Sequence, residues 1–134
     1  MKSQFTYIIM IPVWLGVSIA CGAAPQKVYA QLQAASVEIL VDGRLAGSGS
    51  VVDTQGHVLI ADHMAPSGRV RIEAQSKSLG RLALKTVARD KAHDLMLLVL
   101  PPRKEAYSHL TLAKDQPKAG QPVFLFGAPV FRHE

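Results

Sequence analysis

Cysteine is almost absent from this sequence, and its absence excludes two common ways of stabilising a small protein. The single cysteine, Cys21, lies within the first thirty of the 134 residues, a stretch that reads as a targeting segment. The rest of the chain therefore has no disulfide bond and no cysteine metal site. A chain of this length can bury one modest apolar core, and that core has to hold it together.

Aromatic residues are also scarce, at 6% of the chain, and none is interleaved with the basic residues between positions 69 and 91. Proteins that bind nucleic acids usually combine basic residues with aromatic side chains on which bases stack. We therefore expect no nucleic-acid partner. The basic residues of this stretch are interpreted as a solvated strand face: Arg69, Arg71, Lys77, Arg81, Lys85, Arg89 and Lys91.

The first thirty residues have the three parts of a secretory signal. Lys2 supplies a positive start, an apolar run extends from Tyr7 to Ala20, and Val28-Tyr29-Ala30 forms a cleavage site before Gln31. The run is shorter than the ~20 residues of a membrane-spanning helix. The pattern predicts a signal peptide over residues 1–30 and a secreted or periplasmic mature chain without a membrane span.

Two alternatives for the leader stay open. An uncleaved leader would act as a membrane anchor. The sequence Ser18-Ile19-Ala20-Cys21 also loosely resembles a lipoprotein box, in which lipidated Cys21 would anchor the protein. Each of these routes leads out of the cytoplasm.

The residues after the leader form short apolar runs broken by turn residues, with no long helical period and no internal repeat. Seven or so such strands predict an all-β antiparallel barrel or sandwich, with no helix longer than about two turns after Gln31. The composition, 19% charged and 49% hydrophobic, is that of a globular chain. The expected strands cover residues 36–41, 45–52, 57–61, 69–74, 82–88, 94–100 and 121–127, with a short one possible at 110–112.

Three segments together resemble the trypsin-like serine peptidases of the HtrA (Do-like) type. Residues 47–63 contain Gly47-Ser48-Gly49, then Gly56, then an apolar strand that ends at His63. Residues 90–98 place Asp94-Leu95 before a continuous apolar strand, and residues 123–129 end in Gly127-Ala128-Pro129. In that family these segments contain the catalytic histidine, the catalytic aspartate and the linker that leaves the first of two barrels.

The resemblance implies that residues 31–134 form the N-terminal barrel of a two-barrel peptidase and that the second barrel is absent. It implies that His63 and Asp94, 31 residues apart, are the catalytic histidine and aspartate. In such a triad the histidine takes the proton of a serine hydroxyl, and the aspartate fixes the histidine tautomer. His57 and His93 are interpreted as structural residues, and Asp62 as a solvated one.

The third member of a triad, a serine in a glycine-rich turn, is not found after Asp94. Ser108 lies between Tyr107 and His109, with no glycine nearby. The chain as given is therefore expected to be inactive, although a supplied second barrel would let it cleave a polypeptide substrate. The alternative is a non-catalytic secreted binding module or a relic of a protease.

No cofactor is expected, and no metal site either, because His63, His93 and Asp94 lack the close spacing of metal ligands. The last apolar residues of the chain predict a different partner. Phe124, Phe126, Val130 and Phe131 are expected to promote self-association, since the second barrel that would cover them is missing.

Overall fold

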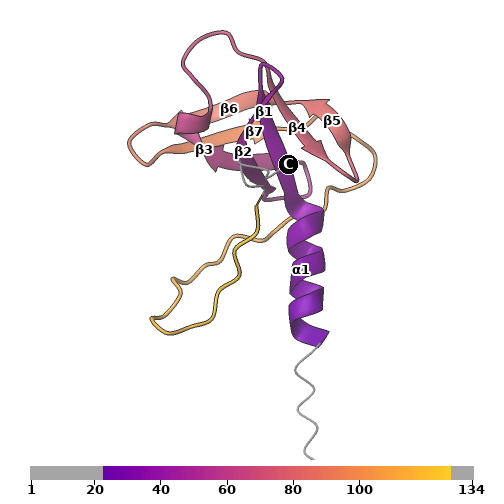
Figure 1. Ribbon diagram of the computed structural model, residues 1–134, viewed down its shortest axis with the longest axis vertical. Coiled ribbons are helices and arrows are strands. Elements are labelled where there is room, and N and C mark those ends of the chain that lie inside the picture. Colours follow the sequence, from indigo (N-terminus) through magenta and orange to yellow (C-terminus); the bar gives the residue numbers. More distant parts are fainter. Residues whose placement is uncertain (1–22, 128–134) are drawn as a thin grey trace, which may run out of the picture.

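The computed structural model describes residues 23–127, which form one helix, one short 3-10 helix and seven strands (Figure 1). No helix within this range is long and apolar enough to cross a membrane. The elements in chain order are α1 (Ala23–Ala35), β1 (Ser36–Val41), β2 (Arg44–Val51), β3 (His57–Ala61), the 3-10 helix η1 (Asp62–Met64), β4 (Ile72–Ser76), β5 (Gly80–Ala83), β6 (Lys85–Asp90) and β7 (Leu95–Val99).

The seven strands form a single antiparallel sheet in the order β5-β4-β1-β2-β3-β7-β6. Its two outer strands, β5 and β6, follow each other in the chain and are separated only by Leu84, whose N–H donates to the carbonyl of Ile72 at 2.9 Å. The sheet therefore curls until its two edges meet in one extended segment. The prediction of an all-β antiparallel barrel is confirmed.

The turn between β1 and β2 has the conformation that its sequence predicts. Asp42 and Gly43 both have positive φ, 49° and 82°, as a two-residue hairpin of type I′ requires. The side chain of Asp42 also accepts a hydrogen bond from the N–H of Arg71 at 2.9 Å, and the Asp42 N–H donates to the Arg71 carbonyl. The hairpin is thereby tied to the residue that precedes β4.

Alternate residues of the strands fill the barrel, as expected for sheets with one buried face. Ile39, Val51, Val58, Met96 and Leu98 are the largest fully buried side chains. Tyr107 joins this core from the irregular segment that follows β7, and its hydroxyl donates to the carbonyl of Pro101 at 2.7 Å. The core thus includes side chains of every strand from β1 to β4 and of β7.

Four of the expected strands are found within a residue at each end, and the others differ. The expected strand 69–74 is shifted to β4, because Arg71 bonds with the β1–β2 turn instead of entering the ladder. The expected strand 82–88 is divided into β5 and β6 at Leu84. The expected strand 121–127 and the short one at 110–112 are wrong, since neither stretch pairs with another strand in the described part of the chain.

The helix α1 continues directly into β1 and projects from one end of the barrel (Figure 1). It crosses the expected boundary between Ala30 and Gln31, which stays a prediction. Its main aromatic contact is with the far end of the described chain, where the rings of Tyr29 and Phe126 meet edge to face at 5.4 Å.

Candidate functional site

Antiparallel pairing of β3 with β7 brings the two predicted catalytic residues together. Ala61, the last residue of β3, is paired with Leu95, the first residue of β7. His63 lies in η1 directly after β3, and Asp94 directly precedes β7. Residues distant in sequence therefore lie side by side at one end of the strand pair.

The side chain of His63 is bonded to Asp94 in the way expected of a histidine–aspartate pair. His63 Nδ1 lies 2.6 Å from Asp94 Oδ2, and the backbone N–H of His63 donates to Asp94 Oδ1 at 2.8 Å. The N–H of Asp62 donates to the backbone carbonyl of Asp94 at 3.1 Å. The expected contact is present, whereas the catalytic role of the two residues stays a prediction.

The backbone of Asp94 adopts a conformation that few residues other than glycine adopt. Its φ is 55°, in the left-handed region, where aspartate is among the better tolerated side chains. Strained backbone of this kind persists when surrounding contacts hold it, and it is concentrated at functional sites. Three hydrogen bonds from Asp62 and His63 hold Asp94 here.

The electrostatics of the pair favour an ionised aspartate. The hydrogen bond from the His63 side chain, followed by the one from its backbone N–H, holds the pKa of Asp94 below its ordinary value. When Nδ1 donates to this carboxylate, Nε2 of the neutral ring is left as a proton acceptor. The side chains are open to solvent, with 73% of His63 and 51% of Asp94 exposed.

Two further histidine–aspartate pairs have similar geometry, so a short Nδ1–carboxylate distance is not specific to a catalytic pair here. His93 Nδ1 lies 2.7 Å from Asp90 Oδ2, and His57 Nδ1 bonds to Asp53. In each pair the backbone N–H of the histidine also donates to the aspartate. These pairs are local, separated by three and four residues. The His63 pair is the one that requires the folded sheet.

The pKa of the aspartate is lowered in each of the two local pairs as well. Burial raises the pKa of Asp53, but hydrogen bonds from the backbone and ring of His57 outweigh it, so the pKa of this carboxyl lies below its ordinary value. The pKa of Asp90 is lowered mainly by the hydrogen bond from His93. A lowered aspartate pKa therefore does not by itself identify a functional pair in this protein.

The residue beside His63 was misjudged from the sequence. Asp62 is buried, with 8% of its surface exposed, and its carboxylate accepts a hydrogen bond from Nε of Arg89. Arg89 also donates through Nη2 to the carbonyl of Ala65 at 2.8 Å. The sequence held no direct signal for this pair, since the two residues are 27 positions apart and β6 looks like an exposed strand.

Comparisons with known proteins identify no family for this chain. A scan against models of protein families finds no match, and no curated protein matches the sequence. The solved structures to which the chain is similar include the MamO protease domain from Magnetospirillum magneticum, in its apo form. The match has a TM-score of 0.48 and 24% identity, and it covers 62% of this chain and 46% of that one. The chain thus spans less than half the length of that domain.

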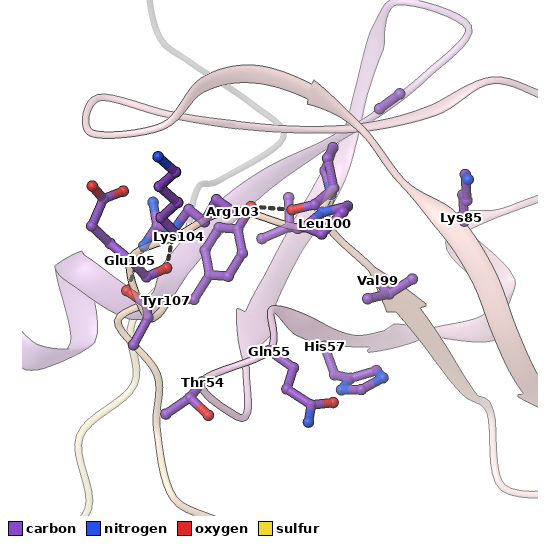
Figure 2. A pocket seen from close by; sticks show the side chains of 14 residues that line it. Thr54, Gln55, His57, Lys85, Val99, Leu100, Arg103, Lys104, Glu105 and Tyr107 are labelled. Carbon is purple, nitrogen blue, oxygen red and sulfur yellow. Dashed lines mark hydrogen bonds between the residues drawn. The ribbon is translucent and has the colours of Figure 1, made fainter.

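A cleft of about 740 Å³ lies at the end of the β3–β7 pair that is opposite His63. Figure 2 shows the side chains that line it. His57, the first residue of β3, and Val99, the last of β7, both line it. Its other wall is the segment after β7, which is held by Arg103. The guanidinium of Arg103 donates to the carbonyls of Glu105 and Ala106 and lies 3.7 Å from the centre of the Tyr107 ring.

The charged groups of this cleft do not converge on one point. Lys85 extends from the strand on one side, and Lys104 lies beside Glu105 on the other (Figure 2). Such a distribution does not define a ligand. Within residues 23–127, no three histidine, cysteine, aspartate or glutamate side chains are grouped so that they could hold a metal ion.

Proposed function

We propose that this chain is the first barrel of an exported trypsin-like serine endopeptidase, in which His63 is the general base and Asp94 its orienting carboxylate. The observation that carries the proposal is the non-local bond between His63 Nδ1 and Asp94 Oδ2 at 2.6 Å. A general base needs its other ring nitrogen unprotonated, and a carboxylate on Nδ1 fixes that tautomer. The fold supports the proposal because His63 follows β3, Asp94 precedes β7, and the pairing of these two strands brings the residues together.

The exposure of the pair also suits a site completed by other polypeptide. A triad carboxylate works in a largely water-excluded setting, whereas half of the Asp94 side chain is exposed here. The only serine that follows Asp94, Ser108, has no neighbouring glycine. The nucleophile and the oxyanion hole therefore have to be supplied by a second barrel, and these residues alone are expected to be inactive.

The first test is to read the DNA downstream of the codon for Glu134 in all three frames. We expect a Gly-x-Ser-Gly-Gly coding stretch. The extended protein should then react with a fluorophosphonate probe at that serine. His63→Ala should reduce the labelling rate on the order of 10³–10⁴-fold, because the serine loses its proton acceptor.

The matched control for this experiment is His93→Ala. His93 is as exposed as His63 and is bonded through Nδ1 to an aspartate in the same manner, but it lies in the turn before β7. Labelling should be unchanged in this variant. Equal losses in the two variants, or undiminished labelling in His63→Ala, would exclude His63 as the base.

A non-catalytic secreted binding module, or the relic of a protease, is the alternative. The absence of a glycine-flanked serine after Asp94 favours it over catalysis by these residues alone. The two functions predict different DNA downstream of the codon for Glu134 and different folding of the isolated chain. A stop codon with no Gly-x-Ser-Gly-Gly stretch beyond it, together with a monomeric and cooperatively folding chain, would support the binding module.

A further inference from the structure

The ring of His63 is held at Asp94 by a turn that has little stability of its own. The helix η1 is three residues long, and no side chain caps its N-terminus. A single 3-10 turn has poorer hydrogen-bond geometry than an α-helix and leaves most of its backbone groups without partners inside the turn. Contacts from outside η1 therefore have to fix its position.

Arg89 provides such contacts at both ends of the turn. It lies on β6, where it is paired with Met96 of β7. Its Nε donates to the Asp62 carboxylate, and its Nη2 donates to the carbonyl of Ala65, the residue that follows η1. One guanidinium thus bonds to the first residue of the turn and to the residue that caps its end.

This contact is more shielded from solvent than an ordinary surface ion pair. Only 11% of the Asp62 side chain is exposed, and 25% of that of Arg89. The hydrogen bond that Arg89 donates to Asp62 raises the pKa of Arg89 above its ordinary value. When one partner of a buried pair is removed, the other charge remains desolvated and unpaired, which is strongly unfavourable.

A short chain of hydrogen bonds connects Arg89 to the candidate catalytic pair. The N–H of Asp62, the residue that Arg89 binds, donates to the backbone carbonyl of Asp94. The next N–H, that of His63, donates to the Asp94 carboxylate. Any shift of η1 away from Arg89 would therefore stretch the bonds that orient both members of the pair.

We propose that Arg89 is a positioning residue, which holds η1 through Asp62 and the Ala65 carbonyl so that His63 stays bonded to Asp94 through Nδ1. The catalytic meaning of this inference rests on the proposed function. The positioning itself can be measured without any peptidase activity, in the full chain labelled with ¹⁵N.

The test compares the parent protein with Arg89→Lys by nuclear magnetic resonance. Lysine keeps the positive charge, but it cannot place two donors in a fixed fork on Asp62 and Ala65. In the parent we expect the neutral His63 ring to carry its proton on Nδ1. In Arg89→Lys the two tautomers should mix, and the His63 amide should exchange with solvent about tenfold faster.

Arg81→Lys is the matched control. Arg81 forms an equivalent ion pair on another part of the sheet, where its Nη2 donates to Glu73, a side chain as little exposed as that of Asp62. The His63 tautomer and exchange rate should stay at their parent values in this variant. Parent-like His63 signals in Arg89→Lys, or equal changes in both variants, would overturn the proposal.

A second variant covers the case in which Arg89→Lys does not fold. The double substitution Asp62→Leu with Arg89→Leu replaces a buried ion pair with apolar groups, a change that proteins often tolerate. We expect a folded chain with mixed His63 tautomers, and a parent-like tautomer would overturn the proposal. If the His63 tautomers mix in Arg89→Lys while the extended protein shows no labelled serine, the positioning role of Arg89 is supported and the proposed peptidase function is excluded.

Discussion

Asp94 differs from the other aspartates that bind a histidine in this protein, because its partner comes from a distant part of the chain. Asp53 and Asp90 bind histidines within four residues, as aspartates in turns commonly do. The bonds of Asp94 to His63 exist only when β3 and β7 are paired. The bonds that lower the pKa of Asp94 therefore depend on the pairing of two strands, whereas those of Asp53 and Asp90 join near neighbours in the chain.

This linkage predicts how acid acts on the protein. The pKa of Asp94 in the folded chain lies below its ordinary value of 3.8, mainly because of the hydrogen bond from His63. A carboxyl with a lowered folded-state pKa contributes stability that is fully present above the unfolded-state pKa and is lost as the pH falls through the folded-state value. In Asp94→Asn the free energy of unfolding should therefore fall less steeply between about pH 5 and pH 2.

Urea unfolding at a series of pH values measures this difference. Asp53, Asp90 and Glu73 have lowered pKa values too, so the informative quantity is the difference between the variant and the parent. Asp115→Asn, at an exposed position in the segment after β7, is the control and should leave the slope unchanged. A slope in Asp94→Asn equal to that of the parent would mean that the His63 bond is not linked to folding.

The buried face of β7 gives a prediction at the residue scale that concerns the core alone. Leu98 is fully buried between its neighbours on β3 and β6. Leu98→Ala should lower the free energy of unfolding by about 2–5 kcal/mol, as large-to-small core substitutions do. Leu112→Ala, at an exposed position, should change it by less than about 0.5 kcal/mol. Chemical denaturation of the two variants compares these values directly, and equal losses would contradict the described core.

At the scale of elements, η1 is held by a glycine as well as by Arg89. A Cβ at Gly47 on β2 would meet the thioether of Met64, the last residue of η1. The glycine therefore leaves room for Met64 to pack against β2. Gly47→Ala should turn the flexible Met64 side chain out of this space and cost less than about 1 kcal/mol of stability, below the usual cost of overpacking, because the thioether can adopt another rotamer.

A double-mutant cycle separates this contact from a general effect of alanine in a strand. Met64→Ala removes the thioether, so Gly47→Ala should cost much less when it is added to that variant. Denaturant unfolding of the four proteins gives the coupling energy. Additive losses would show that Gly47 and Met64 do not interact.

The elements show how far the sequence predicts this fold. Alternation, continuous apolar runs and turn residues located β1, β2, β3 and β7, because each of these strands has a buried face and ends at turn residues. The segment 121–127 also contains an apolar run and yet forms no strand in the described chain. The pattern of apolar residues indicates that a segment fits a sheet. Pairing also needs a neighbouring strand, and the local sequence does not show whether there is one.

The candidate site was predictable to a similar extent. The resemblance singled out His63 and Asp94, and the structure brings them into contact. The buried pair of Asp62 and Arg89 was missed, because the position of Arg89 on an apparently exposed strand gave no reason to expect burial. Contacts between side chains of different strands depend on register, and the register of β6 includes an irregularity between Thr86 and Ala88.

At the scale of the whole molecule, the barrel and the segment after it differ in secondary structure and in how many large apolar side chains they expose. The barrel buries most of its large apolar side chains, whereas residues 101–127 contain no helix or strand and expose several. Three of them are consecutive, namely Val123, Phe124 and Leu125, and the last is fully exposed at 101%. Phe126 is partly covered by contact with Tyr29, while Val130 and Phe131, which were expected to contribute, lie outside the described residues.

This exposed stretch predicts that the chain associates with itself or binds hydrophobic dyes in solution. Contiguous apolar surface of a few hundred Å² drives association in soluble proteins. At ~25 cal/mol per Å², covering it is worth several kcal/mol, which is comparable with the stability of a small domain, roughly 5–15 kcal/mol. In the proposed two-barrel peptidase, a second barrel would cover such a stretch. When residues 1–134 are studied alone, a second copy of the chain is the nearest available apolar surface.

Light scattering at several protein concentrations, together with dye fluorescence, tests this expectation. The parent chain should form dimers or larger species, and Phe124→Ser combined with Leu125→Ser should shift it toward the monomer and reduce dye binding. Both substitutions lie outside the barrel core, so the thermal melt of the sheet should be retained. The control is Leu112→Ser, an exposed apolar residue away from the stretch, which should leave association unchanged. A parent chain that is monomeric at all concentrations, melts sharply and binds no dye would contradict the prediction and favour a self-sufficient binding module over one half of a peptidase.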